Sequence, residues 1–138
     1  MITVYGGGSW GTALAHVLAS AGREVSLLLR DEAVAAAVNE RHENPRYLPG
    51  LPLAPSLRAV TDSSVLGASD VWVLAVPCQN QRGALEAART LLRPETVIVN
   101  AAKGIELDTL KPLSVVTREA LGGTEEDVRC RYAMLSGP

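Results

Sequence analysis

The sequence predicts an α/β fold, in which helices cover both faces of a doubly wound, mostly parallel sheet. Three observations predict it. Short β-branched apolar runs alternate with segments of helical period along the chain. One run, residues 71–76, is apolar at almost every position, as in strands buried on both faces of a parallel sheet. A glycine-rich turn joins the first strand to the first helix, and this alternation favours right-handed crossovers between parallel strands.

The first thirty residues form a β-α-β unit. Ile2–Tyr5 is a short apolar run that ends in glycines, which is typical of a buried strand. Residues 9–21 repeat their apolar positions with the period of a helix, and Gly22 ends it. Residues 24–29 then return as a second strand.

The rest of the chain continues the alternation. Prolines and glycines interrupt residues 44–55, so we expect an irregular surface segment there. The other expected elements are a helix over residues 33–40, a strand over 60–62, a short helix over 63–68, strands over 71–76 and 96–100, helices over 79–92 and 110–121, and a final strand over 132–135.

Composition limits the partners. The chain has 138 residues, 47% of them apolar, which is enough for one core and predicts one domain over residues 1–138. A net charge of −2 argues against nucleic acid, and no run reaches the ~18 apolar residues of a membrane span. We therefore expect a cytoplasmic protein. Cys78 and Cys130 lack metal-ligand spacing, so neither a metal site nor a disulfide framework is expected.

The glycine turn has the spacing of a dinucleotide site of the Rossmann type. Gly6 permits a tight turn out of the strand, Gly8 lets the backbone approach a pyrophosphate, and Gly11 lets the helix pack on the strand. The helix amino terminus offers N–H donors and a partial positive charge to phosphates. Ser9 and Trp10 lie in the turn, so both are expected to contact an NAD or NADP cofactor.

The end of the second predicted strand indicates which nicotinamide cofactor is preferred. Domains selective for NAD place an acidic residue there to bind the ribose hydroxyls. Here Arg30 follows the strand, and a guanidinium can pair with a 2′-phosphate. Asp31 comes next and would weaken that preference. The sequence therefore predicts NAD or NADP binding, with NADPH preferred.

Two more residues follow predicted buried strands. Pro77 comes after the strand at 71–76 and is expected to line the cofactor cleft. Lys103 comes after the strand at 96–100, so it should lie at the carboxyl edge of the sheet, where ligands bind in open α/β folds. Its ammonium group can hold a phosphate or polarise a carbonyl oxygen. Lys111 is expected to be ordinary solvated surface at the start of a helix.

Several separated motifs together resemble one family over the whole chain, the amino-terminal domain of bacterial NAD(P)-dependent glycerol-3-phosphate dehydrogenase. The resemblance implies hydride transfer between sn-glycerol 3-phosphate and dihydroxyacetone phosphate. It also implies cofactor contacts at Ser9, Trp10 and Arg30, a lysine shared by cofactor and substrate at Lys103, and a substrate contact at Gly137. The motifs are Gly6-Gly7-Gly8-Ser9-Trp10-Gly11, Asn44-Pro45-Arg46-Tyr47-Leu48-Pro49, Ala75-Val76-Pro77, Ala102-Lys103-Gly104-Ile105-Glu106 and Ser136-Gly137-Pro138.

The resemblance also implies which parts of the enzyme this chain does not contain. Members of the family run to more than twice this length, and their helical carboxyl-terminal domain supplies the main catalytic lysine and most substrate and dimer contacts. We therefore expect no catalytic residue in this chain, slow or absent turnover, and some self-association through uncovered apolar surface. Full-length members are expected to be homodimers. The family commonly has serine where this chain has Cys78.

Two other functions share the glycine turn. One is a different NADP-dependent reductase, of the β-hydroxyacid or ketopantoate type, which a substrate panel would distinguish. The other is a non-catalytic module that binds nucleotide and reports redox state to a partner. The motifs around Asn44 and Lys103 favour the glycerol phosphate interpretation.

Overall fold

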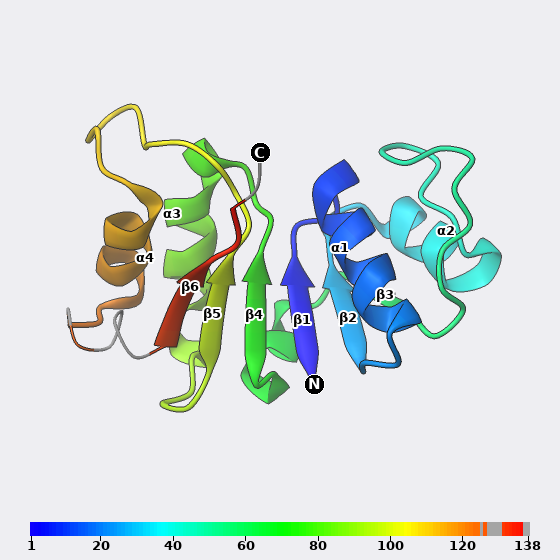
Figure 1. Ribbon diagram of the computed structural model, residues 1–138, viewed down its shortest axis with the longest axis horizontal. Helices are drawn as coiled ribbons and strands as arrows, with labels where there is room; N and C mark the ends of the chain where they lie inside the picture. Colours follow the sequence, from blue (N-terminus) through cyan, green and yellow to red (C-terminus); the bar gives the residue numbers. More distant parts are fainter. Residues whose placement is uncertain (125, 127–130, 137–138) are drawn as a thin grey trace.

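Six parallel strands form one sheet in the order β3-β2-β1-β4-β5-β6 (Figure 1). The computed structural model describes residues 1–124, 126 and 131–136. The chain winds outward from β1 to β2 and β3, then returns to the other side of β1 and winds outward again, which confirms the doubly wound α/β fold. The strands are β1 Ile2–Tyr5, β2 Val25–Leu28, β3 Arg58–Val60, β4 Val71–Leu74, β5 Val97–Asn100 and β6 Tyr132–Met134.

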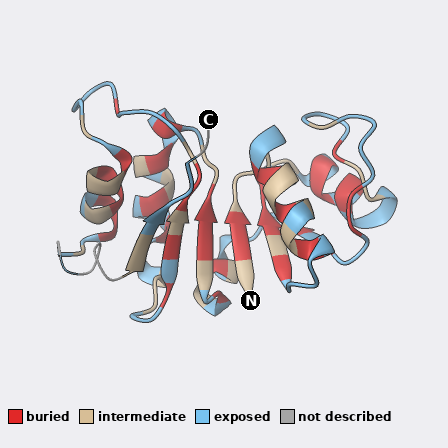
Figure 2. Cartoon of the chain, in the orientation of Figure 1, coloured by how far each residue is buried: buried red, intermediate tan, exposed pale blue. Residues whose placement is uncertain are grey.

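Helices cover both faces of this sheet. On one face α1 and α2 bury a cluster that includes Val4, Ala15 and Val38. On the other, α3, α4 and the short helix η1 bury Leu66, Leu85 and the sheet residues beneath them. Figure 2 shows buried residues along the strands and on parts of the helices that pack against them. The helices are α1 Ser9–Ser20, α2 Glu32–Arg41, η1 Ser63–Ala68, α3 Cys78–Ala88, η2 Arg89–Leu91 and α4 Leu113–Leu121.

The position of β4 inside the sheet, with helices on both faces, explains why its sequence is apolar at almost every residue. Val73 faces the cluster beneath α1, whereas Trp72 and Leu74 face the cluster beneath α3. Trp72 is fully buried and its indole N–H donates to the carbonyl oxygen of Leu66 at 2.9 Å. A strand covered on both faces has no polar side, as the sequence predicts.

Most expected elements are confirmed, and the differences lie at their ends. The expected strand at 60–62 lies at Arg58–Val60, because Asp62 instead caps η1 by accepting from Ser64 N at 2.9 Å. The expected helix at 110–121 starts at Leu113, because Pro112 lacks an N–H and takes the N-cap position. The strand at 71–76 ends at Leu74, and the helix at 79–92 ends at Ala88 before the turn of η2.

The carboxyl ends of β1, β4 and β5 meet at one edge of the sheet. Tyr5 is level with Leu74, and Leu74 with Asn100. The connections that leave these strands start at Gly6, Ala75 and Ala101, and each keeps a backbone hydrogen bond of 2.8 to 2.9 Å to the neighbouring strand. Since the chain leaves β1 and β4 toward opposite faces, a crevice opens between them.

Candidate functional site

In the glycine turn between β1 and α1, Gly6 and Gly11 are crowded by backbone atoms, whereas Gly8 faces open space. Gly6 has φ +123°, and a Cβ there would lie 2.7 Å from the carbonyl carbon and oxygen of Ala75. A Cβ on Gly11 would fall against the carbonyl oxygen of Gly6 and lie 3.0 Å from the Cβ of Ala75. These two glycines are therefore required by the fold itself. A Cβ on Gly8 would meet nothing within 4 Å.

Helix α1 begins beside this open space. Gly8 is its N-cap, no side chain caps its N–H groups, and no acidic residue lies in the first turn. The positive end of the helix dipole therefore faces the space above Gly8 without a neutralising carboxylate in that turn. Ser9 and Trp10 are the first residues of α1, rather than part of the turn.

A polar contact set fastens the segment after α2 to the glycine turn. Asn44 is fully buried, and its Nδ2 donates to Gly7 O at 3.2 Å and to Thr12 Oγ1 at 2.8 Å. Its Oδ1 accepts from Tyr47 N at 3.1 Å. Ser9 Oγ donates to the carbonyl oxygen of Tyr47 at 2.6 Å. The irregular segment thus fixes the turn from outside, a role that the sequence pattern did not assign to Asn44.

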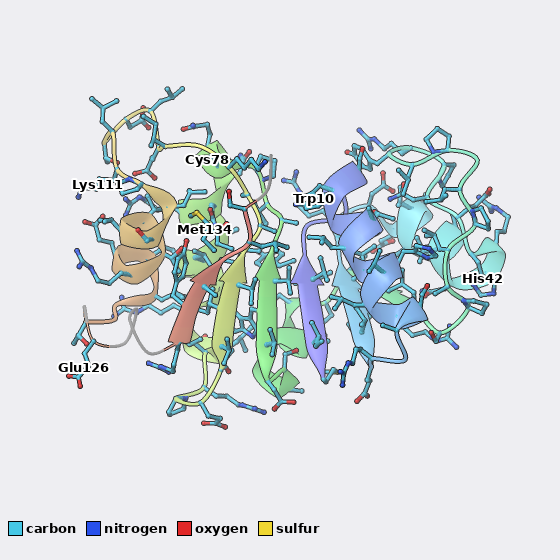
Figure 3. The ribbon with its side chains drawn as sticks, in the orientation of Figure 1. Trp10, His42, Cys78, Lys111, Glu126 and Met134 are labelled. Atoms are coloured by element: carbon cyan, nitrogen blue, oxygen red, sulfur yellow. The ribbon has the colours of Figure 1, made fainter. Side chains whose placement is uncertain are left out.

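A cleft of about 710 Å³ opens at the carboxyl edge of β4. Trp10 lies on one side of it, with its indole N–H donating to Ala101 O at 3.1 Å, and Cys78 lies on the other (Figure 3). Burial and the charge of Glu106 both raise the pKa of the Cys78 thiol, so it stays protonated. The cleft is lined by Trp10, Leu14, Ala75, Val76, Pro77, Cys78, Ala101, Ala102, Lys103, Leu135 and Ser136.

The predicted site residues fall into four groups. The glycines Gly6, Gly8 and Gly11 form the turn, and Trp10, Pro77 and Lys103 line the cleft beside it. Arg30 is exposed just beyond β2 and is not among the residues that line the cleft. Gly137 lies outside the described residues.

Asp31 is committed to other contacts. Its Oδ1 accepts from the backbone N–H groups of Ala33 at 3.0 Å and Val34 at 3.2 Å, which makes it the N-cap of α2. Its Oδ2 accepts from Arg46 Nη1 at 2.9 Å. The Val34 bond, and then the Arg46 and Ala33 bonds, lower the pKa of this carboxyl. The carboxylate that would bind ribose hydroxyls is therefore engaged by the protein itself.

A charged network lies under the residues that follow Lys103. Arg82 donates two parallel hydrogen bonds of 2.8 Å to Glu106, and a third of 2.9 Å to Glu119. Lys111 Nζ donates to Glu119 at 2.6 Å, so Lys111, whose side chain is 41% exposed as expected of a surface lysine, also joins this network. The sequence pattern missed Arg82 and Glu106, because 24 residues separate them.

The Arg82–Glu106 ion pair predicts that the free energy of unfolding decreases at acidic pH. Hydrogen bonds from Arg82 and then Thr109 lower the pKa of Glu106 from its ordinary value of 4.5 to about 2. A depressed pKa means that the charged form is stabilised above pH 4.5 and that this stabilisation is lost as pH falls toward about 2. Glu106→Gln should therefore destabilise the chain at neutral pH, and the difference from wild type should shrink between these limits. Urea unfolding of both proteins across this range measures it, and a difference independent of pH would contradict the assignment.

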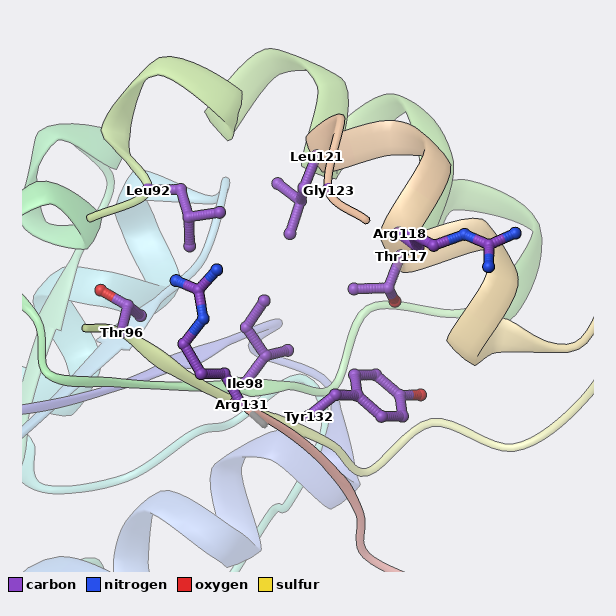
Figure 4. A pocket seen from close by; sticks show the side chains of 9 residues that line it. All are labelled: Leu92, Thr96, Ile98, Thr117, Arg118, Leu121, Gly123, Arg131 and Tyr132. Atoms are coloured by element: carbon purple, nitrogen blue, oxygen red, sulfur yellow. The ribbon is translucent and has the colours of Figure 1, made fainter. Parts of the chain in front are cut away.

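A second pocket, of about 40 Å³, lies between α4 and the β5–β6 edge, where apolar residues such as Ile98 and Leu121 line it together with threonines and arginines (Figure 4). It is far too small for a dinucleotide. No group of three or more histidine, cysteine or acidic residues is arranged to hold a metal within the part of the chain that the structure describes.

Among the described residues, none of the helices has the length and apolar character to cross a membrane.

Comparison with known proteins gives one consistent result. Residues 1–138 match the family model described as NAD-dependent glycerol-3-phosphate dehydrogenase N-terminus. The chain is 53% identical over 137 residues to glycerol-3-phosphate dehydrogenase [NAD(P)+] of Desulfovibrio desulfuricans, and 48% identical over 138 residues to that of Nitratidesulfovibrio vulgaris. These alignments cover 99% of this chain and 40% and 41% of the relatives, so the chain spans about 40% of their length.

A solved structure agrees with the sequence relatives. Glycerol-3-phosphate dehydrogenase from Coxiella burnetii superposes with a TM-score of 0.85 at 30% identity, covering 99% of this chain and 40% of that one.

Proposed function

Because the chain belongs to the NAD-dependent glycerol-3-phosphate dehydrogenase family, whose amino-terminal part it matches over residues 1–138, we propose that it forms the cofactor-binding part of such an enzyme. The whole protein would interconvert sn-glycerol 3-phosphate and dihydroxyacetone phosphate with NAD(P). The observation that carries the proposal is the open space above Gly8, which adjoins the uncapped start of α1 and the cleft that Lys103 lines.

The described residues fit a dinucleotide along this path. Gly8 and the first N–H groups of α1 would hold the pyrophosphate, and Ser9 would stay fixed by its bond to Tyr47. Trp10 and Pro77 would border the nicotinamide end of the cleft. When bound, the nicotinamide supplies or accepts the hydride. Gly6 and Gly11 act indirectly, because they set the path of the turn.

Lys103 would serve both ligands. It borders the cleft at the carboxyl edge of β5, and its ammonium group matches a phosphate or a carbonyl oxygen on which negative charge develops. Gly137 would add a substrate contact by the same resemblance. The homodimeric state and the cytoplasmic location that the resemblance implies belong to this proposal for the whole protein.

Calorimetric titration of the chain tests the proposal. We expect saturable binding of NADPH, and tighter binding of dihydroxyacetone phosphate than of ketopantoate to the NADPH complex. Lys103→Met should abolish that difference. No binding of either nicotinamide cofactor would contradict the cofactor part, and a preference for ketopantoate would favour a ketopantoate-type reductase instead. Turnover of dihydroxyacetone phosphate by residues 1–138 alone is expected to be slow or absent.

The preference for NADPH is part of the same proposal. Arg30 is exposed beyond β2, and the Asp31 carboxylate beside it is held by the N-cap of α2 and by Arg46. Arg46 therefore neutralises Asp31, the acidic residue that directly follows Arg30. The guanidinium of Arg30 would then pair with the 2′-phosphate of NADPH.

Arg30→Ala should lower the ratio of NADPH to NADH affinity by about tenfold, since a charged hydrogen bond is worth about 1.5–3 kcal/mol. Dissociation constants for both cofactors measure the ratio. Arg23→Ala is the matched control, because Arg23 is also an exposed arginine but lies in the loop that precedes β2, away from the carboxyl edge. An unchanged ratio in Arg30→Ala would remove Arg30 from the site.

A further inference from the structure

The segment that carries Lys103 is fastened to α3 by side chains. We call residues 101–112 the lysine loop. Gln79, in the first turn of α3, donates from Nε2 to Ile105 O at 2.9 Å and accepts at Oε1 from Leu107 N at 3.0 Å. One amide side chain therefore holds the loop backbone on both sides of Glu106.

Arg82 holds the loop one helical turn further along α3. Its guanidinium binds both oxygens of Glu106 at 2.8 Å, in the parallel arrangement that fixes direction as well as distance. The Glu106 side chain is only 8% exposed and that of Arg82 26%, so this pair is largely shielded from solvent. Arg82 also binds Glu119 of α4, which joins the loop to both helices.

The loop closes on itself around the same carboxylate. Glu106 N donates to Lys111 O at 3.0 Å, and Leu110 N donates to Glu106 O at 2.8 Å. Thr109 Oγ1 donates to the Glu106 carboxylate as well. Leu110 adopts φ +55°, a conformation that bulky residues rarely take, so these bonds hold the loop in an unfavourable backbone shape.

Apolar burial contributes little to holding this loop. Ile105, Leu107 and Leu110 are 51%, 68% and 71% exposed, so its large apolar side chains face outward. The polar contacts of Gln79 and Arg82 are therefore what fix the loop against α3. Lys103 lies only three residues before Glu106, and Gly104 between them has φ +127° with the Cys78 side chain 3.3 Å from its Cβ position. The path from the clamped carboxylate back to Lys103 is thus narrowly defined.

We propose that Arg82 is a positioning residue, which acts through Glu106 and together with Gln79 to hold the lysine loop so that Lys103 borders the cofactor cleft. This inference rests on the proposed function, because it assigns Arg82 an effect on a ligand that Lys103 contacts. Arg82 itself does not line the cleft.

A double-mutant cycle tests whether Arg82 acts through Lys103. Arg82→Met and Lys103→Met should each weaken NADPH binding, by about tenfold for a mispositioned or lost charged contact. The double variant should bind no more weakly than Lys103→Met alone, because contacts in one network are not additive. If Arg82→Met weakens binding equally in both backgrounds, Arg82 acts by another route and the proposal is overturned.

Hydrogen exchange of the backbone amides tests the clamp without any ligand. In Arg82→Met the amides of Glu106 and Leu107 should exchange at least about tenfold faster than in wild type. Arg93→Met is the matched control, because Arg93 is similarly shielded and pairs with Asp70 at 2.7 Å near the opposite edge of the sheet. It should leave both the loop exchange and the NADPH affinity unchanged.

The outcomes separate this inference from the proposed function. Absence of NADPH binding by wild type contradicts the proposed function, and the positioning role with it, even where exchange supports the clamp. If Lys103→Met binds NADPH as tightly as wild type, the role of Lys103 fails and so does the effect assigned to Arg82. If Arg82→Met does not fold, Glu106→Gln, which keeps the side-chain shape and loses the charge, replaces it in the cycle with the same expected result.

Discussion

Gly8→Ala should abolish most nicotinamide cofactor binding while leaving the fold intact. Gly8 has φ −71°, which alanine adopts freely, and a Cβ there would meet no protein atom within 4 Å. The space above Gly8 is therefore not needed by the protein. A pyrophosphate lying on this backbone would meet the added methyl group, and such overpacking costs about 1–3 kcal/mol, or about ten- to a hundredfold in affinity.

The measurements are calorimetric affinity for NADPH and thermal unfolding of the same variant. Gly83→Ala serves as the control, because Gly83 also has nothing within 4 Å of its Cβ position but lies on the exposed side of α3. That variant should bind NADPH normally and gain stability by about 0.5–1 kcal/mol from helix propensity. NADPH binding by Gly8→Ala within twofold of wild type would mean that no phosphate approaches this turn.

The contrast among the three glycines shows what the sequence could predict. Their spacing between a strand and a helix is local, so the turn, the start of α1 and the dinucleotide site follow from residues 1–21 alone. Which glycine serves the fold and which serves a ligand depends on Ala75, which β4 brings beside Gly6 from about 70 residues away. A single sequence carries no signal for that pairing.

The side of the cleft that carries Lys103 is held by contacts between residues that are far apart in the sequence. Lys103 was predictable because it follows a buried strand, and carboxyl ends of parallel strands share one edge. The side chains that hold the lysine loop could not be predicted, because Gln79 and Arg82 contact Glu106 and its neighbours only once α3 packs beneath this loop. Asn44 likewise reaches Gly7 across 37 residues. Polar residues in loops and on helix surfaces resemble solvated positions until the fold brings their partners together.

Gly11→Ala should destabilise the whole domain, in contrast to Gly8→Ala. Two effects oppose each other at this position. Alanine inside a helix gains about 1 kcal/mol over glycine. The Cβ, however, would fall against the carbonyl oxygen of Gly6, a backbone atom that cannot rotate away, and lie 3.0 Å from the Ala75 methyl group. Overpacking against backbone costs about 3 kcal/mol or more, so the clash outweighs the gain in helix propensity.

Relief of the clash requires α1 to move away from β1 and β4. Ala15 and Ala19, which α1 buries against the sheet, would then lose their contacts with Val4 and its neighbours. A net loss of about 2 kcal/mol is a large share of the stability of an ordinary domain and should lower Tm by several degrees, about 5 °C or more. Thermal unfolding followed by the loss of helical circular dichroism measures it. A Tm equal to that of wild type would show that α1 packs farther from the Gly6 carbonyl than the structure has it. It would contradict the inference that only glycine fits at position 11.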